Sequence, residues 1–240
     1  MSAQGRQPSA AKLESVGQAI GQILTFGVGI GLSPIPIIAI VLVLSTPKAS
    51  TNAWAFLAGW IVGLALLGTI VLLVASGASA SDHGKPATWV SVLKIALGVL
   101  LLALAIKQWR GRPQGDAEPK LPGWMRSVET LTPMRSTALG AALAAINPKN
   151  LLLVIGGAAA IAQTGASAVS QAVAMIVFIA IATVGVAVPI GVYVFMGNRA
   201  SRILGRLHEW MARENATIMA VLCLIIGAKL IGDAISGLTA

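Results

Sequence analysis

The sequence predicts an all-α membrane protein with six transmembrane helices, arranged as two inverted-topology repeats of three helices, in which helices one and four are broken. Hydrophobic residues make up 56% of the 240 residues and charged residues only 10%, whereas soluble domains carry roughly 25% charged residues. Six apolar stretches reach the roughly 20 residues that one span requires. Proline motifs inside spans one and four predict the two breaks.

The six expected spans follow one another along nearly the whole chain. They cover residues 16–44, 53–75, 88–106, 137–162, 167–195 and 215–235. We divide the chain into an N-terminal tail, a first three-helix repeat, a cytoplasmic linker with an amphipathic helix and a second three-helix repeat, at residues 1–15, 16–110, 111–136 and 137–240.

The basic residues predict the orientation in the plasma membrane. Of the 17 lysines and arginines, eleven lie in the loops that follow odd-numbered spans and only three lie on the opposite side. Cytoplasmic loops carry the excess of basic residues, so both termini are expected outside. The net charge of +9 is mostly this topological signal, and nucleic acid is not an expected partner.

Two loop segments have apolar residues at helical spacing and are expected to lie in the membrane interface. We interpret them as surface connectors rather than specific binding sites. The linker contributes Leu121, Trp124, Met125, Val128 and Leu131, and the loop before span six contributes Ile203, Leu204, Leu207, Trp210 and Met211. Tryptophans near span ends are expected to anchor the chain at the interface, namely Trp54, Trp89, Trp109 and Trp210.

Spans one and four each contain a proline motif. Span one has Ser33-Pro34-Ile35-Pro36 and span four has Asn147-Pro148-Lys149-Asn150. Proline removes a backbone donor and pushes the preceding residue out of the helical region. Proline also suits the first position of a new helix, and Ser and Asn are good N-caps. Each motif therefore predicts the N-terminus of a half-helix that starts inside the membrane.

The two motifs occur at matching places in two similar halves. Each is followed by an apolar half-helix, a long span and a third span. Three spans per unit place the second unit in the opposite orientation, and broken helices in inverted repeats are where secondary transporters bind substrate. The alternative is two proline kinks in ordinary helices. We favour the transporter, because both motifs are capped and lie at equivalent positions.

Three lysines fall within the expected spans. Lys94 is close to a span end, from which its ammonium can extend to the surface. Lys229 precedes Asp233 by four residues, on the same helix face. Lys149 lies roughly 18 Å into span four at 1.5 Å per residue, where a charge costs about 2.5–3.5 kcal/mol and indicates function. The alternative for Lys149 is a structural lysine held by backbone carbonyls freed at the break.

Several motifs resemble one known family. The chain is similar to the GAP family, the peptidoglycolipid- and sulfolipid-addressing (Sap-like) proteins of mycobacteria and relatives, which is grouped with the lysine-exporter superfamily of six-span exporters. The resemblance implies a role in moving cell-envelope glycolipids across the plasma membrane. It rests on Leu32-Ser-Pro-Ile-Pro-Ile-Ile-Ala, Thr46-Pro-Lys-Ala, Phe56-Leu-Ala-Gly-Trp, Pro122-Gly-Trp-Met-Arg, Leu131-Thr-Pro and Asn147-Pro-Lys-Asn-Leu-Leu-Leu.

We therefore expect a transporter that moves an amphipathic lipid or glycolipid, with an anionic headgroup, for cell-envelope assembly. The alternatives are an exporter of a small solute, such as an amino acid or ion, and a non-transporting accessory subunit of a separate energised lipid exporter. Membrane lipids are expected partners, and a homo-oligomer is left open. No catalytic residues, metal ligands or cofactors are expected, since His83 and His208 lie in loops on opposite sides and Cys223 is the single cysteine.

The expected substrate site lies where the two half-helices begin. Their N-termini carry free N–H groups and a partial positive charge, and Lys149 adds a full charge. An anion between the two ends would be attracted by all three. The expected substrate-binding residues are Ser33, Pro34, Pro36, Asn147, Pro148, Lys149 and Asn150.

Overall fold

The computed structural model describes residues 21, 23–79, 81–82, 85–112 and 131–239. The N-terminal tail, His83 and all but Leu131 of the apolar linker face lie outside the described residues. A first helical segment, Ile23–Gly31, precedes the labelled elements. These are α2 (Pro34–Leu44), α3 (Ala49–Gly77), β1 (Ser81–Asp82), β2 (Lys85–Pro86), α4 (Thr88–Arg110), α5 (Pro133–Ala145), α6 (Pro148–Ala162), α7 (Ala168–Met196), η2 (Gly197–Arg199) and α8 (Ala200–Thr239).

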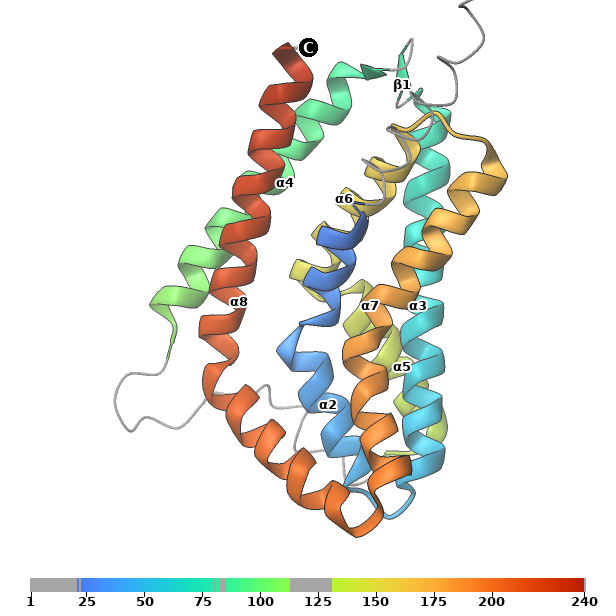
Figure 1. The fold of residues 1–240 in the computed structure, drawn as a ribbon, viewed down its shortest axis with the longest axis vertical. Helices are drawn as coiled ribbons and strands as arrows, with labels where there is room; N and C mark the ends of the chain where they lie inside the picture. Colours follow the sequence, from blue (N-terminus) through green and yellow to red (C-terminus); the bar gives the residue numbers. More distant parts are fainter. Residues whose placement is uncertain (1–20, 22, 80, 83–84, 113–130, 240) are drawn as a thin grey trace, which may run out of the picture.

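The described part of the chain is a bundle of helices (Figure 1). Four helices are long and apolar enough to cross a bilayer, namely α3, α4, α7 and α8. Two further helix pairs qualify when each is counted as one bent span, so the chain is a multi-pass membrane protein with four spans, or six with the bent pairs. The sequence predicted neither the antiparallel pair β1–β2, with two residues per strand, nor the short 3-10 helix η2.

The two predicted breaks are present. The segment Ile23–Gly31 meets α2 at 44°, and α5 meets α6 at 64°. Ser33 and Asn147 leave the helical conformation, with ψ of 113° and 120°, and each new helix starts at the following proline. The structural reason is the one expected: proline at the first helical position has no N–H to leave unpaired.

One boundary prediction is wrong. The interfacial helix around Ile203–Met211 was expected to be separate from span six, but both belong to the single helix α8. No proline or glycine breaks the chain between Met211 and Ala220, so the helical hydrogen bonds continue. Figure 1 shows the consequence: the first part of α8 runs along the lower end of the bundle and the second part rises beside α4.

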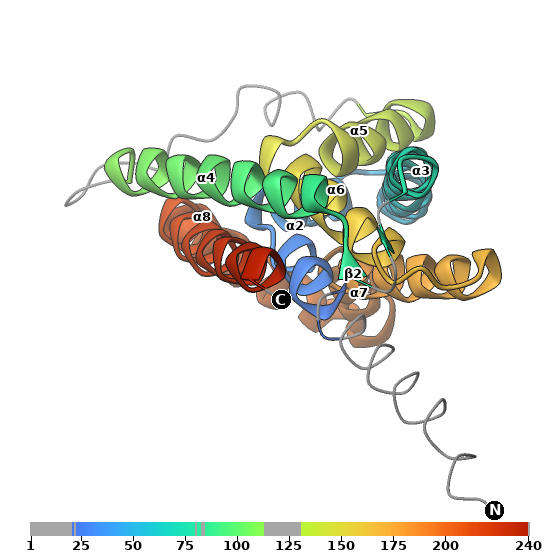
Figure 2. The ribbon, with the colours of Figure 1, turned by 90° about the horizontal axis from the view of Figure 1, so that it is seen from above.

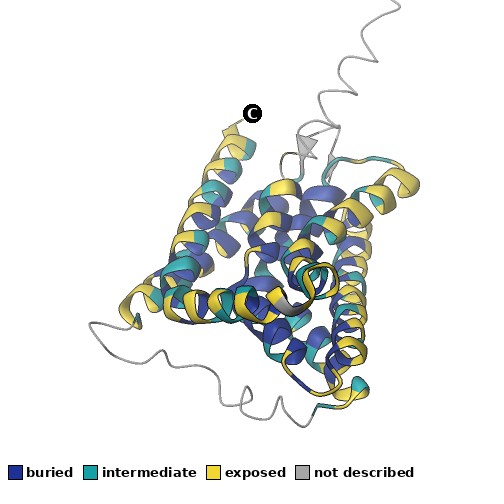
Figure 3. Cartoon of the chain, turned by 60° about the horizontal axis from the view of Figure 1, so that its bottom comes forward, coloured by how far each residue is buried: buried dark blue, intermediate teal, exposed yellow. Residues whose placement is uncertain are grey.

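The connections between helices lie at the two ends of the bundle. Figure 1 places the β1–β2 hairpin and the C-terminus at one end, and the α2–α3 and α7–α8 connections at the other. Seen from above, α2 and α6 lie in the middle, between the α4–α8 pair and the helices α3 and α5 (Figure 2). The buried residues gather in this centre, and the outer faces of the peripheral helices are exposed (Figure 3).

The exposed faces are apolar, as a lipid-facing surface must be. On α3, Leu66, Ile70 and Leu73 are 58–66% exposed, and on α7 Val169 and Ile176 are 75% and 66% exposed. A water-soluble monomer rarely exposes so large an apolar surface. The outward side chains are therefore suited to contact with lipid.

Glycines allow the long helices to touch the broken ones. On α7, a methyl group added to Gly185 would collide with the Gly31 carbonyl. On α5, one added to Gly140 would collide with the Phe56 carbonyl of α3. Backbones approach this closely in membranes only where side chains are small. Each long helix thus packs against the first part of the broken span from the other half of the chain.

Candidate functional site: a buried polar connection between two broken spans

The polar centre of the bundle is built around the start of α6. Asn147 caps this helix, because its side-chain oxygen accepts the N–H of Lys149 at 3.2 Å. Capping fixes the first turn, in which Lys149 and Asn150 face inward: Lys149 is 1% exposed and Asn150 is fully buried. The sequence pattern Asn-Pro-Lys-Asn therefore places a cation and an amide side by side in the interior.

The Lys149 ammonium crosses to the first broken span. Its Nζ donates a hydrogen bond to the backbone carbonyl of Gly29, at 2.6 Å. That carbonyl belongs to the last turn of Ile23–Gly31, where helical carbonyls lack their usual partners. The N–H of Ser33, four residues on, bonds instead to Ile30. The break at Pro34 thus frees the acceptor that holds the lysine, which is the alternative the sequence left open.

Asn150 makes the second connection. Its Oδ1 accepts the hydroxyl hydrogen of Ser33 at 3.2 Å, and its Nδ2 donates to the carbonyl of Leu143 at 3.1 Å. Leu143 lies in the last turn of α5, so its carbonyl is another group without an intrahelical partner. Asn150 therefore pairs with a free carbonyl at the end of α5, in its own broken span, and also bonds to Ser33 in the other broken span.

Ser33 does not act as expected. It occupies the N-cap position of α2, but its side chain makes no capping bond to that helix. The hydroxyl is directed to Asn150 instead, because Pro36 has no N–H at one of the positions that an N-cap side chain would reach. Ser33 is 1% exposed, so this bond between the halves is buried.

The structure brings only part of the predicted site together. Ser33, Lys149 and Asn150 are linked by hydrogen bonds, whereas Pro148 is exposed and Asn147 is half-buried. Pro34 and Pro36 are buried in the first turn of α2. Sequence reasoning missed the Gly29 carbonyl, although counting the carbonyls freed before Pro34 would have found it. It also missed Cys223 of α8, whose buried thiol lies within electrostatic range of Lys149.

Among the described residues, no carboxylate pairs with the charge at the centre. Within the described part of the chain, the ion pair is Lys229–Asp233, at 2.6 Å, as predicted. Lys94 was expected to reach the surface, but it is only 4% exposed and lies within electrostatic range of Asp233 and Lys229. The packing of α4 against α8 encloses it, and Asp233 offsets its charge. Among the described residues, the Lys149 ammonium bonds to the Gly29 carbonyl, and the Cys223 thiol lies within electrostatic range of it.

These features define a polytopic α-helical membrane protein in which two broken spans meet at a buried, positively charged centre. The chain belongs to the family of Sap, the sulfolipid-1-addressing protein, whose sequence model matches residues 23–236. The match covers both broken spans, α3, α4 and α7, and α8 up to residue 236, and it confirms the resemblance found in the sequence. Among curated proteins and solved structures, no significant match was found. The membership connects this membrane protein with lipid-related processes; the link to the lysine-exporter superfamily stays a prediction.

Proposed function

We propose that this chain moves an anionic amphipathic lipid or glycolipid from the cytoplasmic to the outer leaflet of the plasma membrane, and that the centre around Lys149 binds its headgroup. The observation that carries the proposal is a fully buried lysine with no carboxylate partner among the described residues. Such a charge is expensive in the membrane. A protein gains from keeping it if a transported anion takes the place of the weak carbonyl partner.

The reciprocal packing of the long helices supports an inverted repeat. The first part of each broken span lies against the long helix of the other half, through Gly31 with Gly185 and through Gly140 with Phe56. The hydrogen bonds of Ser33 and Lys149 also connect the two halves. In an inverted repeat, rocking of one unit against the other would break these bonds and expose the site alternately to the two sides.

The orientation we propose places both termini outside, on the evidence of the basic loops. An anion moving outward is then driven by the membrane potential, at about 2.3 kcal/mol per charge per 100 mV. The process involves no covalent chemistry, metal or cofactor. A lipid is favoured over a small solute because the family whose model matches this chain is that of a sulfolipid-addressing protein.

Lys149→Met in proteoliposomes tests the proposal. The probe is a sulfated glycolipid with a fluorescent acyl chain, and its unsulfated counterpart is the comparison. We expect wild type to translocate the sulfated probe faster, and Lys149→Met to lose that advantage while keeping its helical content. Lys48→Met is the matched control, because Lys48 is exposed in the α2–α3 connection. Undiminished translocation of the sulfated probe by Lys149→Met would contradict the proposal.

Two other outcomes distinguish the alternatives. Failure of purified wild-type protein to move either probe, with loss of the lipid from the outer leaflet in cells that lack the protein, would favour the accessory role. Uptake or release of small anions without any movement of the lipid probes would favour the solute exporter. The lipid content of the two leaflets is measured in cells that lack the protein and in cells that carry Lys149→Met. The two sets of cells can then be compared directly.

A further inference from the structure

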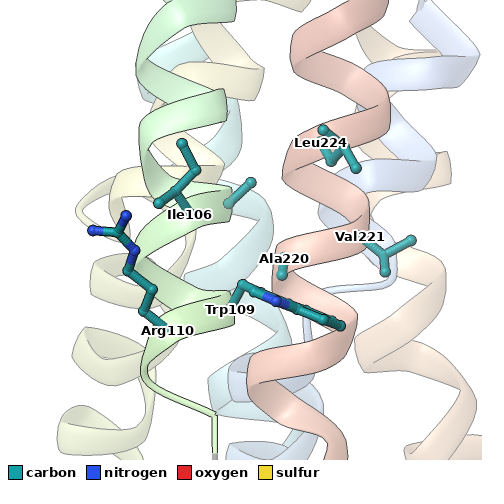
Figure 4. A pocket seen from close by; sticks show the side chains of 7 residues that line it. Ile106, Trp109, Arg110, Ala220, Val221 and Leu224 are labelled. Carbon is teal, nitrogen blue, oxygen red and sulfur yellow. The ribbon is translucent and has the colours of Figure 1, made fainter.

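A second site candidate lies on the lipid-facing side of the bundle, between α4 and α8. The two helices form a pocket of about 430 Å³, within the range of small-molecule sites, lined by Ala105, Ile106, Trp109, Arg110, Ala220, Val221 and Leu224. Figure 4 shows side chains of both helices along this gap, with the Trp109 ring extending from α4 toward α8. We call this pocket the α4–α8 groove.

Small residues create the groove. Higher along the pair, α4 and α8 touch at Gly98 and Gly227, where an added methyl group on either glycine would come within 3.0 Å of the other's carbonyl. Below that contact the helices diverge toward the Arg110 end (Figure 1). Ala105 and Ala220, both buried, form the floor, and the larger Ile106, Val221 and Leu224 are about half exposed. The result is an apolar channel open to the side.

The mouth of the groove is positively charged and ordered. Arg112 stacks its guanidinium over the Trp109 ring at 3.8 Å from the ring centre, and its Nη1 donates to the Trp109 carbonyl at 2.7 Å. Cation–π stacking and this bond hold the two side chains together. Arg110, the residue after Trp109, also lines the groove and is exposed. Guanidinium groups bind phosphate and sulfate through paired N–H donors, and tryptophan is typical of the headgroup level.

We propose that the α4–α8 groove binds an anionic lipid of the cytoplasmic leaflet, with one acyl chain against Ala105 and Ala220 and the headgroup at Arg110 and Arg112. This inference takes from the proposed function only the orientation of α4 in the membrane. Charge complementarity selects this occupant: a neutral lipid would leave the arginines without an anion, and a water-soluble anion would leave the apolar channel empty. The negative surface potential of that leaflet adds to the attraction.

The experiment measures quenching of tryptophan fluorescence by lipids with dibrominated acyl chains. Wild-type protein and Trp109→Phe are reconstituted with brominated phosphatidylglycerol or brominated phosphatidylcholine, and their difference isolates Trp109. We expect the anionic lipid to occupy the groove at lower concentration than the neutral one. Removal of both charges, in Arg110→Gln with Arg112→Gln, should cost about fivefold in that preference for each arginine.

Filling the groove gives an independent variant. Val221→Phe adds a ring at a rim position that is 43% exposed, so the core is not disturbed. It should lower quenching of Trp109 by both brominated lipids. Leu66→Phe, at a 61% exposed position on α3, is the matched control and should leave quenching unchanged. Arg206→Gln, exposed on α8, is the control for charge and should leave the lipid preference unchanged.

Three results would overturn the inference. They are equal quenching of wild-type Trp109 by the anionic and neutral lipids, an unchanged preference in the double arginine variant, and displacement of the anionic lipid by sodium sulfate at constant ionic strength. The last would mean that a soluble anion suffices. Because quenching does not depend on translocation, a groove that prefers the anionic lipid in a protein that moves no probe would refute the proposed function and leave the lipid site standing.

Discussion

The two broken spans share a backbone plan and differ in chemistry. The first, Ile23–Gly31 with α2, bends by 44° and continues with Pro34, Ile35 and Pro36; the second, α5 with α6, bends by 64° and continues with a lysine and an asparagine. The first break supplies the Gly29 carbonyl and the Ser33 hydroxyl, and the second supplies the Lys149 ammonium and the Asn150 amide.

The two breaks therefore have different roles. The first break bends the chain and exposes backbone acceptors, and the second break supplies the charged side chain. Both breaks free helical carbonyls, because proline ends the hydrogen-bond ladder in each. Only α6 carries side chains long and polar enough to reach these carbonyls, on its own span at Leu143 and on the other span at Gly29. Substitutions in α6 should therefore disturb binding, whereas equivalent changes in α2 should disturb mainly packing.

The largest effect is expected at the glycines where the long helices touch the broken spans. Methyl groups at Gly185 and Gly140 would each overlap a backbone carbonyl, and a backbone cannot move without its helix. We expect Gly185→Ala and Gly140→Ala each to lower the free energy of unfolding by about 3 kcal/mol, the upper end of usual overpacking penalties. Denaturation in detergent micelles, followed by circular dichroism, measures this.

Gly191→Ala is the matched control on α7, since nothing lies within 4 Å of its added carbon. It should be neutral or slightly stabilising, because alanine is the better helix former. Equal losses in all three variants would show that helix flexibility, rather than close approach, sets the stability. Clearly unequal losses of stability at Gly185 and Gly140 would show that the two helix contacts are not equivalent.

The next effect separates the polar contributions of the two breaks. Asn150→Leu leaves the Leu143 carbonyl and the Ser33 hydroxyl without their partner. Each buried unsatisfied group costs about 1–3 kcal/mol, and at the lower end of that range the two groups together cost about 2 kcal/mol. Ser33→Ala removes one bond and should cost about 1 kcal/mol. If Ser33→Ala is the more damaging change in the same unfolding measurement, the polar centre does not depend mainly on α6.

The third effect concerns the cap of α6. Asn147→Ala removes the acceptor for the Lys149 N–H and should cost about 1 kcal/mol of stability. Asn147→Asp keeps the cap, since Asp and Asn cap about equally well, but it adds a carboxylate beside Lys149. We therefore expect Asn147→Asp to remain stable and to translocate the sulfated probe more slowly than wild type. Faster translocation by Asn147→Asp would mean that no anion binds at this helix end.

The smallest change in stability is expected for Pro148→Ala. Position 148 is the first of α6, where no helical bond is lost, so the cost should stay below about 1 kcal/mol. The new N–H allows α5 to continue into α6, which would reduce the 64° bend. Spin labels at Met134 and Ser167 would then move apart, and translocation would fall. An unchanged distance would show that tertiary packing, and not proline, maintains the break.

Much of the architecture follows from the sequence, because hydropathy and proline act locally. The membrane class, the long helices and the starts of α2 and α6 at Pro34 and Pro148 follow from runs of residues close together in the chain. The i,i+4 pair Lys229–Asp233 is local in the same way. The continuity of α8 was missed, because an interfacial and a spanning segment differ in polarity although their backbone is the same.

Within the candidate site, the sequence alone determined that Lys149 is deep in a span, that Asn147 caps α6 and that two half-helices begin at matching motifs. Only the tertiary structure decided where the lysine is directed and what Ser33 does. Gly29 is 120 residues from Lys149, and Ser33 is 117 residues from Asn150. Patterns of residue type fix which groups lack partners, but which carbonyl meets which donor depends on how closely two distant backbones pack, and glycines such as Gly31 and Gly185 determine that approach.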